Sequence, residues 1–110
     1  MAIITSMAED LPMTVQHRPR VVWDGARVFV RATQAPGFFE FAWAVRESLG
    51  REMYDELIAT HERLAVAAPG PGADRYAADL EAGRWRVRLD ELLAARPELT
   101  PAVVEMTNRG

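Results

Sequence analysis

A series of helix-breaking residues separates stretches in which apolar residues recur every three or four positions, and this alternation leaves few folds open. Gly50 closes the first stretch, Pro69-Gly70-Pro71-Gly72 closes the second, and Pro97 closes the third. Apolar residues at this spacing lie along one face of an α-helix, whereas proline and glycine tend to end helices. The sequence therefore predicts a mainly α fold, a small domain of three to four helices.

Each predicted helix has one apolar face and a recognisable boundary. Asp74 is a good N-cap residue for the third helix, and Thr100 with Pro101 opens the last one. Trp85 lies on the apolar face of the third helix and is the predicted anchor of the core. The predicted helices cover residues 38–49, residues 51 to at most 68, residues 74–96 and residues 102–106, the last with Thr100 as its cap and Pro101 in the first helical position.

The first 20 residues show no sustained apolar period. They contain three methionines and two prolines, and a proline biases the residue before it toward extended backbone, as at Arg18-Pro19. We therefore predict a flexible N-terminal arm over residues 1–20, extended or ordered by a partner, and a helical domain over residues 21–110.

Residues 21–30 combine two signals of β structure. Runs of β-branched and aromatic residues flank Asp24-Gly25 on both sides. An Asp-Gly pair between such runs is typical of a tight hairpin turn. We expect one short hairpin or extended segment near residues 21–31.

The charged residues and the lack of thiols exclude several function classes. The chain has no cysteine, and all 13 of its Lys and Arg positions are arginine. This excludes disulfides, thiolate metal sites, Schiff-base lysines and phosphate-loop lysines. The net charge of -3 argues against a nucleic-acid partner. No apolar run approaches the roughly 20 residues of a membrane span, and the first residues do not read as a signal peptide, so we expect a cytoplasmic protein without a membrane partner.

Few residues of this sequence could carry catalysis or bind a metal. His61 has no Asp, Glu or His at the spacings of three or four that place two ligands on one helix face, so its predicted role is packing. Ser6 and Ser48 are the only serines, and neither lies in the strained, glycine-flanked turn of a nucleophile. We predict no catalytic residue and no metal ligand in this chain.

Arg84, Arg86 and Arg88 carry guanidinium groups that suit phosphate and carboxylate partners. Only Arg84 and Arg88 share a helix face. Glu81 precedes Arg84 by three residues and Asp90 follows Arg86 by four, so helical ion pairs are expected. We interpret this segment as an ion-paired, solvated surface, and the alternative is a set of arginines directed at a partner.

Aromatic residues gather in the first predicted helix. Phe39 and Trp43 are four positions apart but lie off the apolar face of that helix. Aromatic residues often dominate protein interfaces, so Phe39 and Trp43 are candidate partner-binding residues. Arg46 and Arg51 are expected to reach anionic groups of the same partner.

Several short motifs follow one another in a fixed order along the chain. They are Asp24-Gly25 with Val28-Phe29; Pro36 before Phe41-Ala42-Trp43-Ala44-Val45; Gly50 before Tyr54-Asp55-Glu56-Leu57; and Tyr76, Arg84-Trp85, Leu89, Leu92, Leu93 and Leu99-Thr100. In this order they resemble the helical N-terminal domain of nitrile hydratase β subunits and its free-standing relatives, the nitrile hydratase accessory (activator) proteins and the β chain of thiocyanate hydrolase. The chain departs from that family at Gly37, where a tryptophan is expected.

The resemblance implies that a cobalt or iron ion, its cysteine thiolates and the nitrile belong to a partner, the α subunit of a nitrile hydratase type enzyme. This chain itself would bind no cofactor and would be at most a non-catalytic subunit of such a lyase. In the family's enzymatic β subunits an arginine of the second helix hydrogen-bonds the oxidised cysteine ligands of the metal. Ile58 corresponds to that arginine here, although Arg46 or Arg51 could substitute.

Three functions stay open at this point. The first is an accessory protein that binds the α subunit through Phe39, Trp43, Arg46 and Arg51 and assists its assembly or metal loading, and the position of Ile58 favours it. The second is a non-catalytic structural subunit of a multi-chain nitrile hydratase or thiocyanate hydrolase. The third is a generic protein-interaction module such as an antitoxin or adaptor.

Overall fold

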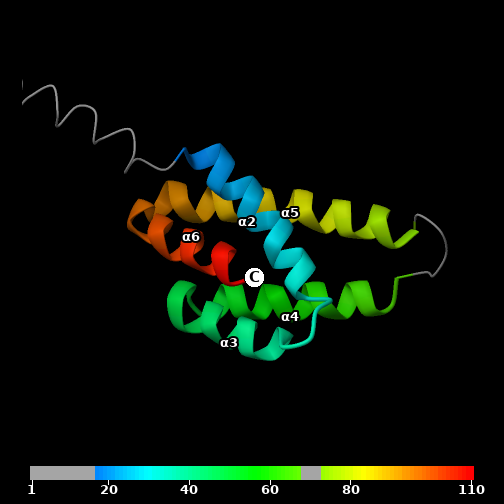
Figure 1. Ribbon diagram of the computed structural model, residues 1–110. Helices are drawn as coiled ribbons and strands as arrows, with labels where there is room; N and C mark the ends of the chain where they lie inside the picture. Colours follow the sequence, from blue (N-terminus) through cyan, green and yellow to red (C-terminus); the bar gives the residue numbers. More distant parts are fainter. Residues whose placement is uncertain (1–16, 68–72) are drawn as a thin grey trace, which may run out of the picture.

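The computed structural model describes residues 17–67 and 73–110, and every regular element in these two ranges is helical. In chain order the elements are α2 (Arg18–Ala32), α3 (Phe38–Leu49), α4 (Arg51–Ala65), α5 (Ala73–Ala95), the short 3-10 helix η1 (Pro97–Leu99) and α6 (Thr100–Arg109) (Figure 1). The predicted mainly α fold is confirmed. None of these helices is long and apolar enough to cross a membrane.

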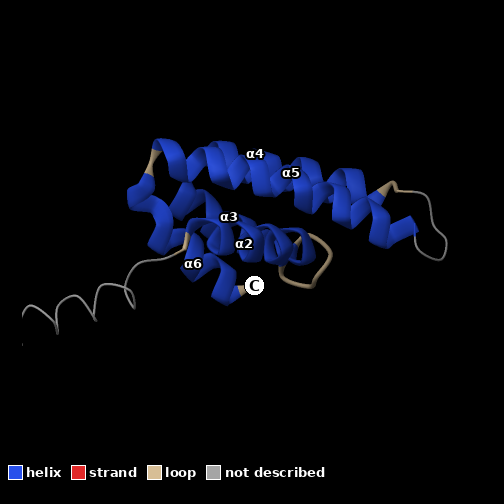
Figure 2. Ribbon diagram, turned by 90° about the horizontal axis from the view of Figure 1, so that it is seen from above, coloured by secondary structure: helices blue, strands red, loops and turns tan. Residues whose placement is uncertain are grey.

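The α-helices of the described residues pack in two layers (Figure 2). α4 and α5 lie side by side and antiparallel in one layer, and α2, α3 and α6 form the other. The C-terminal end of α4 and the N-terminal end of α5 project beyond the second layer. The hairpin of α4 and α5 is therefore longer than the layer that it covers.

Three helices predicted from apolar spacing are found close to their expected bounds. α3 covers residues 38–49 as predicted. Glycines at both ends of α3 adopt backbone with positive φ, which favours glycine: φ is 82° at Gly37 and 105° at Gly50. α4 ends at Ala65, before the Pro-Gly segment, and α5 spans Ala73–Ala95.

The last helix is longer than predicted. α6 reaches Arg109 rather than Met106, and η1 precedes it. Thr100 was expected to cap the helix, but it is the first residue of α6 and its Oγ1 donates a hydrogen bond to the carbonyl oxygen of Pro97 at 2.8 Å. Beyond Met106 the helix continues through hydrogen bonds: the Thr107 hydroxyl donates to the carbonyl oxygen of Val103 at 2.8 Å, and the Gly110 N–H donates to that of Met106 at 3.1 Å.

The predicted hairpin near residues 21–31 is wrong, because this segment lies within α2. Gly25 lies where α2 approaches α5 and α6: a Cβ atom there would come within 3.1 Å of Leu89 Cδ1 and 3.4 Å of Val103 Cγ1. Tertiary packing that needs a small residue at this position overrides the local turn signal. The buried residues of α2 recur with a helical period and comprise Val21, Val22, Gly25, Ala26, Val28, Phe29, Val30 and Ala32.

α2 also begins inside the predicted arm. Residues 18–20 form its first turn, and Pro19 lies there. A proline in the first turn costs no hydrogen bond, because the N–H that it lacks would have no partner within the helix. Arg18-Pro19 therefore starts a helix instead of continuing an extended arm. The rest of the predicted arm, residues 1–16, lies outside the described residues.

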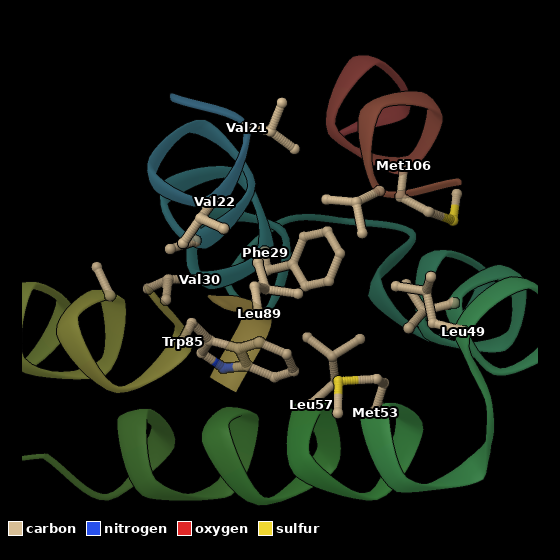
Figure 3. Packing of buried hydrophobic residues seen from close by; sticks show 14 of the residues in the cluster. Val21, Val22, Phe29, Val30, Leu49, Met53, Leu57, Trp85, Leu89 and Met106 are labelled. Atoms are coloured by element: carbon tan, nitrogen blue, oxygen red, sulfur yellow. The ribbon is translucent and has the colours of Figure 1, made fainter. Parts of the chain in front are cut away.

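Trp85 lies in the core between the two layers (Figure 3). Its side chain is fully buried, its ring contacts Phe29 with the ring centroids 5.3 Å apart, and its Nε1–H donates to Thr60 Oγ1 at 2.9 Å. Phe29 in turn contacts Phe41, with centroids 5.4 Å apart. One indole ring thus connects α5 to α2 and α4, and through Phe29 to α3. The prediction that Trp85 lies in the core is confirmed.

Candidate protein-binding site

The outer face of α3 carries two exposed aromatic side chains. Phe39 is 63% exposed and Trp43 is 52% exposed, one helical turn apart. The opposite face of α3 is buried in the core through Phe38, Ala42, Val45 and Leu49. We call Phe39, Trp43, Arg46 and the neighbouring Tyr54 of α4 the α3 aromatic patch. Large aromatic side chains that remain this exposed are typical of surfaces that bind another protein.

Contacts on both sides hold Trp43 in place. The guanidinium of Arg46 lies over its ring, 4.7 Å from the ring centroid, in cation–π geometry. The ring of Tyr54 meets Trp43 edge-on, with centroids 6.3 Å apart and planes at 87°. These contacts restrict the rotamers of Trp43 before binding, so less conformational entropy remains to be lost when a partner covers it.

His61 supports the other end of the patch. Its ring stacks on Phe38 at 4.5 Å and meets the edge of Phe39 at 5.7 Å between centroids. Nδ1–H donates a hydrogen bond of 2.7 Å to the carbonyl oxygen of Thr33, at the C-terminal end of α2. That carbonyl is one of the groups a helix end leaves without an internal partner. His61 is therefore a packing residue that connects α4 to α2, as predicted.

The structure brings three of the four predicted binding residues together. Phe39, Trp43 and Arg46 share the outer face of α3, whereas Arg51 is the first residue of α4. Arg51 is exposed, and its Nε lies 3.9 Å from a carboxylate oxygen of Asp55. Arg51 thus lies beyond the turn between α3 and α4, three residues before Tyr54 of the patch.

Ile58 lies on α4 and is partly buried against the hydrophobic core. It follows Tyr54 by one helical turn and precedes His61 by another. The resemblance assigns this position to an arginine in the enzymatic β subunits, and here it carries an apolar side chain that contributes to packing.

The sequence predicts that Glu81 lies on a solvated surface. This prediction is wrong, because Glu81 is only 5% exposed. Arg63 of α4 forms a two-pronged ion pair with it: Nε lies 2.7 Å from Oε2 and Nη2 lies 2.8 Å from Oε1. The predicted pair within α5 is also present, with Arg84 Nη1 3.1 Å from Oε2. These hydrogen bonds, above all the one from Arg63, outweigh the desolvation of the carboxylate and lower the pKa of Glu81.

The remaining charged residues of this segment contact other helices instead of one another. Asp90 pairs with Arg18 of α2 at 3.0 Å rather than with Arg86. The guanidinium of Arg86 lies 5.3 Å from the ring centroid of Trp23, also in α2. Arg88 pairs with Glu56 of α4 and lies over the ring of Trp85. The arginines of α5 thus connect three helices, which sequence spacing alone could not show.

A cleft of about 610 Å³ lies between α4 and α5. Its charged lining carries both signs, with four carboxylates and two guanidinium groups. Within residues 17–67 and 73–110, no group of three or more His, Asp or Glu side chains could hold a metal ion. The charged lining residues are Glu52, Asp55, Glu56, Glu91, Arg88 and Arg96.

Comparisons of the chain with known protein families, with curated proteins and with solved structures gave no match. The α3 aromatic patch therefore rests on its own geometry as the candidate site. Phe39 and Trp43 could be predicted from the sequence because they lie off the apolar face of their helix. Tyr54 could not, because it belongs to the apolar stripe of α4 and contacts Trp43 only through the packing of the two helices.

Proposed function

We propose that this protein is a helical accessory protein that binds the α subunit of a nitrile hydratase type metalloenzyme and assists its assembly or metal loading. The observation that supports a binding role most directly is the α3 aromatic patch, in which Phe39 and Trp43 are more than half exposed and Arg46 and Tyr54 flank Trp43. Such side chains contribute strongly to binding when a partner covers them. The sequence resemblance supports the identity of the partner.

The proposal divides the chemistry between two chains. The sequence of this chain has no cysteine that could supply a thiolate ligand. His61, its histidine among the helices, uses Nδ1 in the hydrogen bond to Thr33. In the proposed complex the α subunit supplies cobalt or iron with its thiolates, and this chain supplies a surface that positions the α subunit.

The patch suggests how the contact would form. Trp43 and Phe39 would enter apolar hollows of the partner as anchors. The guanidinium of Arg46 lies over the ring of Trp43, and its N–H groups would bind a carboxylate of the partner. Arg51 would pair at the rim. Ile58 offers no hydrogen bond to oxidised cysteine ligands, which favours an accessory factor over a permanent subunit.

Co-expression of the full chain with a nitrile hydratase type α subunit that carries a Cys-x-x-Cys-Ser-Cys motif tests the proposal. We expect a complex on affinity purification. Phe39→Ala combined with Trp43→Ala should weaken it by about tenfold or more, because anchor residues are lost. Val66→Ala is the control, since Val66 is a strongly exposed apolar residue outside the patch. It should bind like the wild type.

Metal analysis then separates the two family roles. An accessory factor should raise the cobalt or iron content of the α subunit when present during synthesis, and its removal afterwards should change little. A permanent structural subunit should instead co-purify with the active enzyme at fixed stoichiometry. No complex at all, or equal binding by the double variant and the wild type, would refute the proposed contact.

A further inference from the structure

α5 has a second apolar face that points away from the core. We call Tyr76, Leu80, Gly83 and Val87 the α5 outer stripe. The three side chains are 68%, 48% and 44% exposed, and a Cβ atom built at Gly83 meets nothing within 4 Å. Their spacing of four, three and four places them along one face of the helix. The opposite face of α5 holds the fully buried Trp85.

Contacts with α2 and α4 border this stripe and leave it open. On one side Trp23 of α2 lies under the guanidinium of Arg86. On the other side Glu81 pairs with Arg63 of α4. The two neighbouring helices therefore occupy the flanks of α5, and the stripe between them faces outward.

We infer that the α5 outer stripe is the contact surface for a second copy of this chain, with the two α5 helices antiparallel. In an antiparallel seam with this repeat, one register sets Leu80 against Gly83 of the second copy and Tyr76 against Val87 of the second copy. Every layer of this register then combines a larger side chain with a smaller one. Gly83 allows close approach and gives Leu80 a place to insert, which satisfies the dense packing of protein interiors.

The charges beside the stripe match in the same register. Asp79 of one copy lies beside Arg86 of the other, and the two-fold symmetry of the pair repeats this contact. Asp79 is exposed, and Arg86 is held at the edge of the stripe by its contact with Trp23. The surface is thus complementary to itself in charge as well as in side-chain size.

A parallel pair fits less well. It would set Gly83 against Gly83 and leave that layer without a side chain. It would also place Asp79 beside Arg84 of the other copy, and Arg84 already pairs with Glu81. The antiparallel register is therefore the one that the stripe and its flanks favour.

Sedimentation of the full chain over a range of concentrations tests the inference. The stripe is short, roughly 18 Å at 1.5 Å per residue, so we expect a weak dimer whose mass depends on concentration. Asp79→Arg alone and Arg86→Asp alone each place like charges together at both contacts. Each should weaken the dimer by about tenfold or more. Glu105→Arg, an exposed acidic position on α6, is the control and should dimerise like the wild type.

Mixing the two single variants makes the test specific for the antiparallel register. A pair of one Asp79→Arg chain and one Arg86→Asp chain has opposite charges at both contacts, so the dimer should reappear. In a parallel pair the mixture would keep a like-charge contact and stay dissociated. Circular dichroism of each variant confirms that its helices are intact.

Three results would overturn the inference. The first is a wild-type chain that remains monomeric up to about 1 mM, a concentration at which even a weak specific dimer populates. The second is dimerisation that neither single variant weakens. The third is a mixture that does not recover the dimer. This surface lies on α5 and is separate from the α3 aromatic patch, so its failure would leave the proposed function untouched.

Discussion

The two parts of α5 are attached to the bundle in different ways. From Trp85 onward α5 is buried through apolar side chains such as Leu89 and Leu93, all three of them at most 1% exposed. The ion pairs of this part, Arg88–Glu56 and Asp90–Arg18, are partly exposed to solvent. The part before Trp85 is attached to α4 through Glu81 and Arg63. An apolar contact has no preferred direction, so spacing along the sequence is enough to locate it. An ion pair needs one particular partner at one particular distance, and the sequence does not name that partner.

The apolar contacts and the ion pair also differ in how much stability is lost when one of their side chains is removed. A buried carboxylate such as Glu81 is stable only while N–H groups compensate for its lost hydration, so losing one partner is costly. An apolar core loses stability in proportion to the volume removed. The following variants test whether this distinction holds.

We expect the largest loss of stability from a substitution at Trp85, which lies where the two parts of α5 meet. Trp85→Ala removes a fully buried ring and the hydrogen bond to Thr60, so we expect the free energy of unfolding to fall by about 3–5 kcal/mol. Urea unfolding followed by circular dichroism measures it. Trp43→Ala, at a half-exposed position, loses only the contacts with Arg46 and Tyr54 and should cost about 1 kcal/mol. A loss below about 1 kcal/mol for Trp85→Ala would mean that the core is not anchored there.

The contribution of the ion pair between Arg63 and Glu81 is tested by replacing Arg63 alone and then both residues. Arg63→Met leaves the Glu81 carboxylate with Arg84 alone, and we expect a loss of about 1–3 kcal/mol, reduced by the partial exposure of Arg63. Arg63→Met combined with Glu81→Leu leaves no buried charge and should recover most of that loss. The same urea titration compares the variants. If the double variant is less stable than Arg63→Met, the carboxylate is not the source of the cost.

The ionisation of Glu81 predicts a pH dependence. Its pKa in the folded protein lies below the ordinary value of 4.5, mainly because of the hydrogen bond from Arg63. The ionised form therefore stabilises the fold fully above that ordinary pKa, and the stabilisation is lost as the pH falls through the lower folded pKa. We expect the stability difference between the wild type and Glu81→Gln to shrink below pH 4.5.

Unfolding measured between about pH 7 and about pH 3 checks this expectation. The pKa of Glu98 is also lowered, but Glu98 is present in both proteins and its effect cancels in the difference. A difference that stays constant over the whole range would show that ionisation of Glu81 does not contribute.

We expect the smallest effects at two glycines: Gly83 within the first part of α5, and Gly25 of α2, which lies against Leu89 in the second part. A Cβ atom at Gly83 meets nothing within 4 Å, so Gly83→Ala should stabilise the monomer by about 0.5–1 kcal/mol through helix propensity. Gly25→Ala has the same propensity gain but places Cβ 3.1 Å from Leu89 Cδ1, so we expect no net gain. Thermal unfolding of dilute protein compares the two. Equal gains would mean that Leu89 moves aside freely.

Much of the fold could be predicted because α3, α4 and α5 carry an apolar period and end at glycine or proline. α2 has a period as well, but Asp24-Gly25 between β-branched runs imitates a hairpin. The segment is helical because Gly25 comes close to Leu89 and Val103, which are far away in the sequence. No local signal contains that information.

In the candidate site, too, some residues could be predicted from the sequence and others could not. Phe39 and Trp43 could be predicted as exposed because they lie off the apolar face of their own helix. Tyr54 could not be assigned to the patch, because its contact with Trp43 depends on how α3 and α4 pack. Glu81 is similar, since its partner Arg63 is 18 residues away on another helix.

The three tryptophans of the chain lie at graded depths, with Trp85 fully buried, Trp23 39% exposed and Trp43 52% exposed. Indole emission shifts with the amount of water around the ring, so the intrinsic fluorescence of this protein combines three distinct signals. Acrylamide should quench Trp43 first and Trp85 last. A partner that covers the α3 aromatic patch would shield Trp43 from the quencher, and unfolding would expose Trp85 to it, so both events can be followed optically without any label.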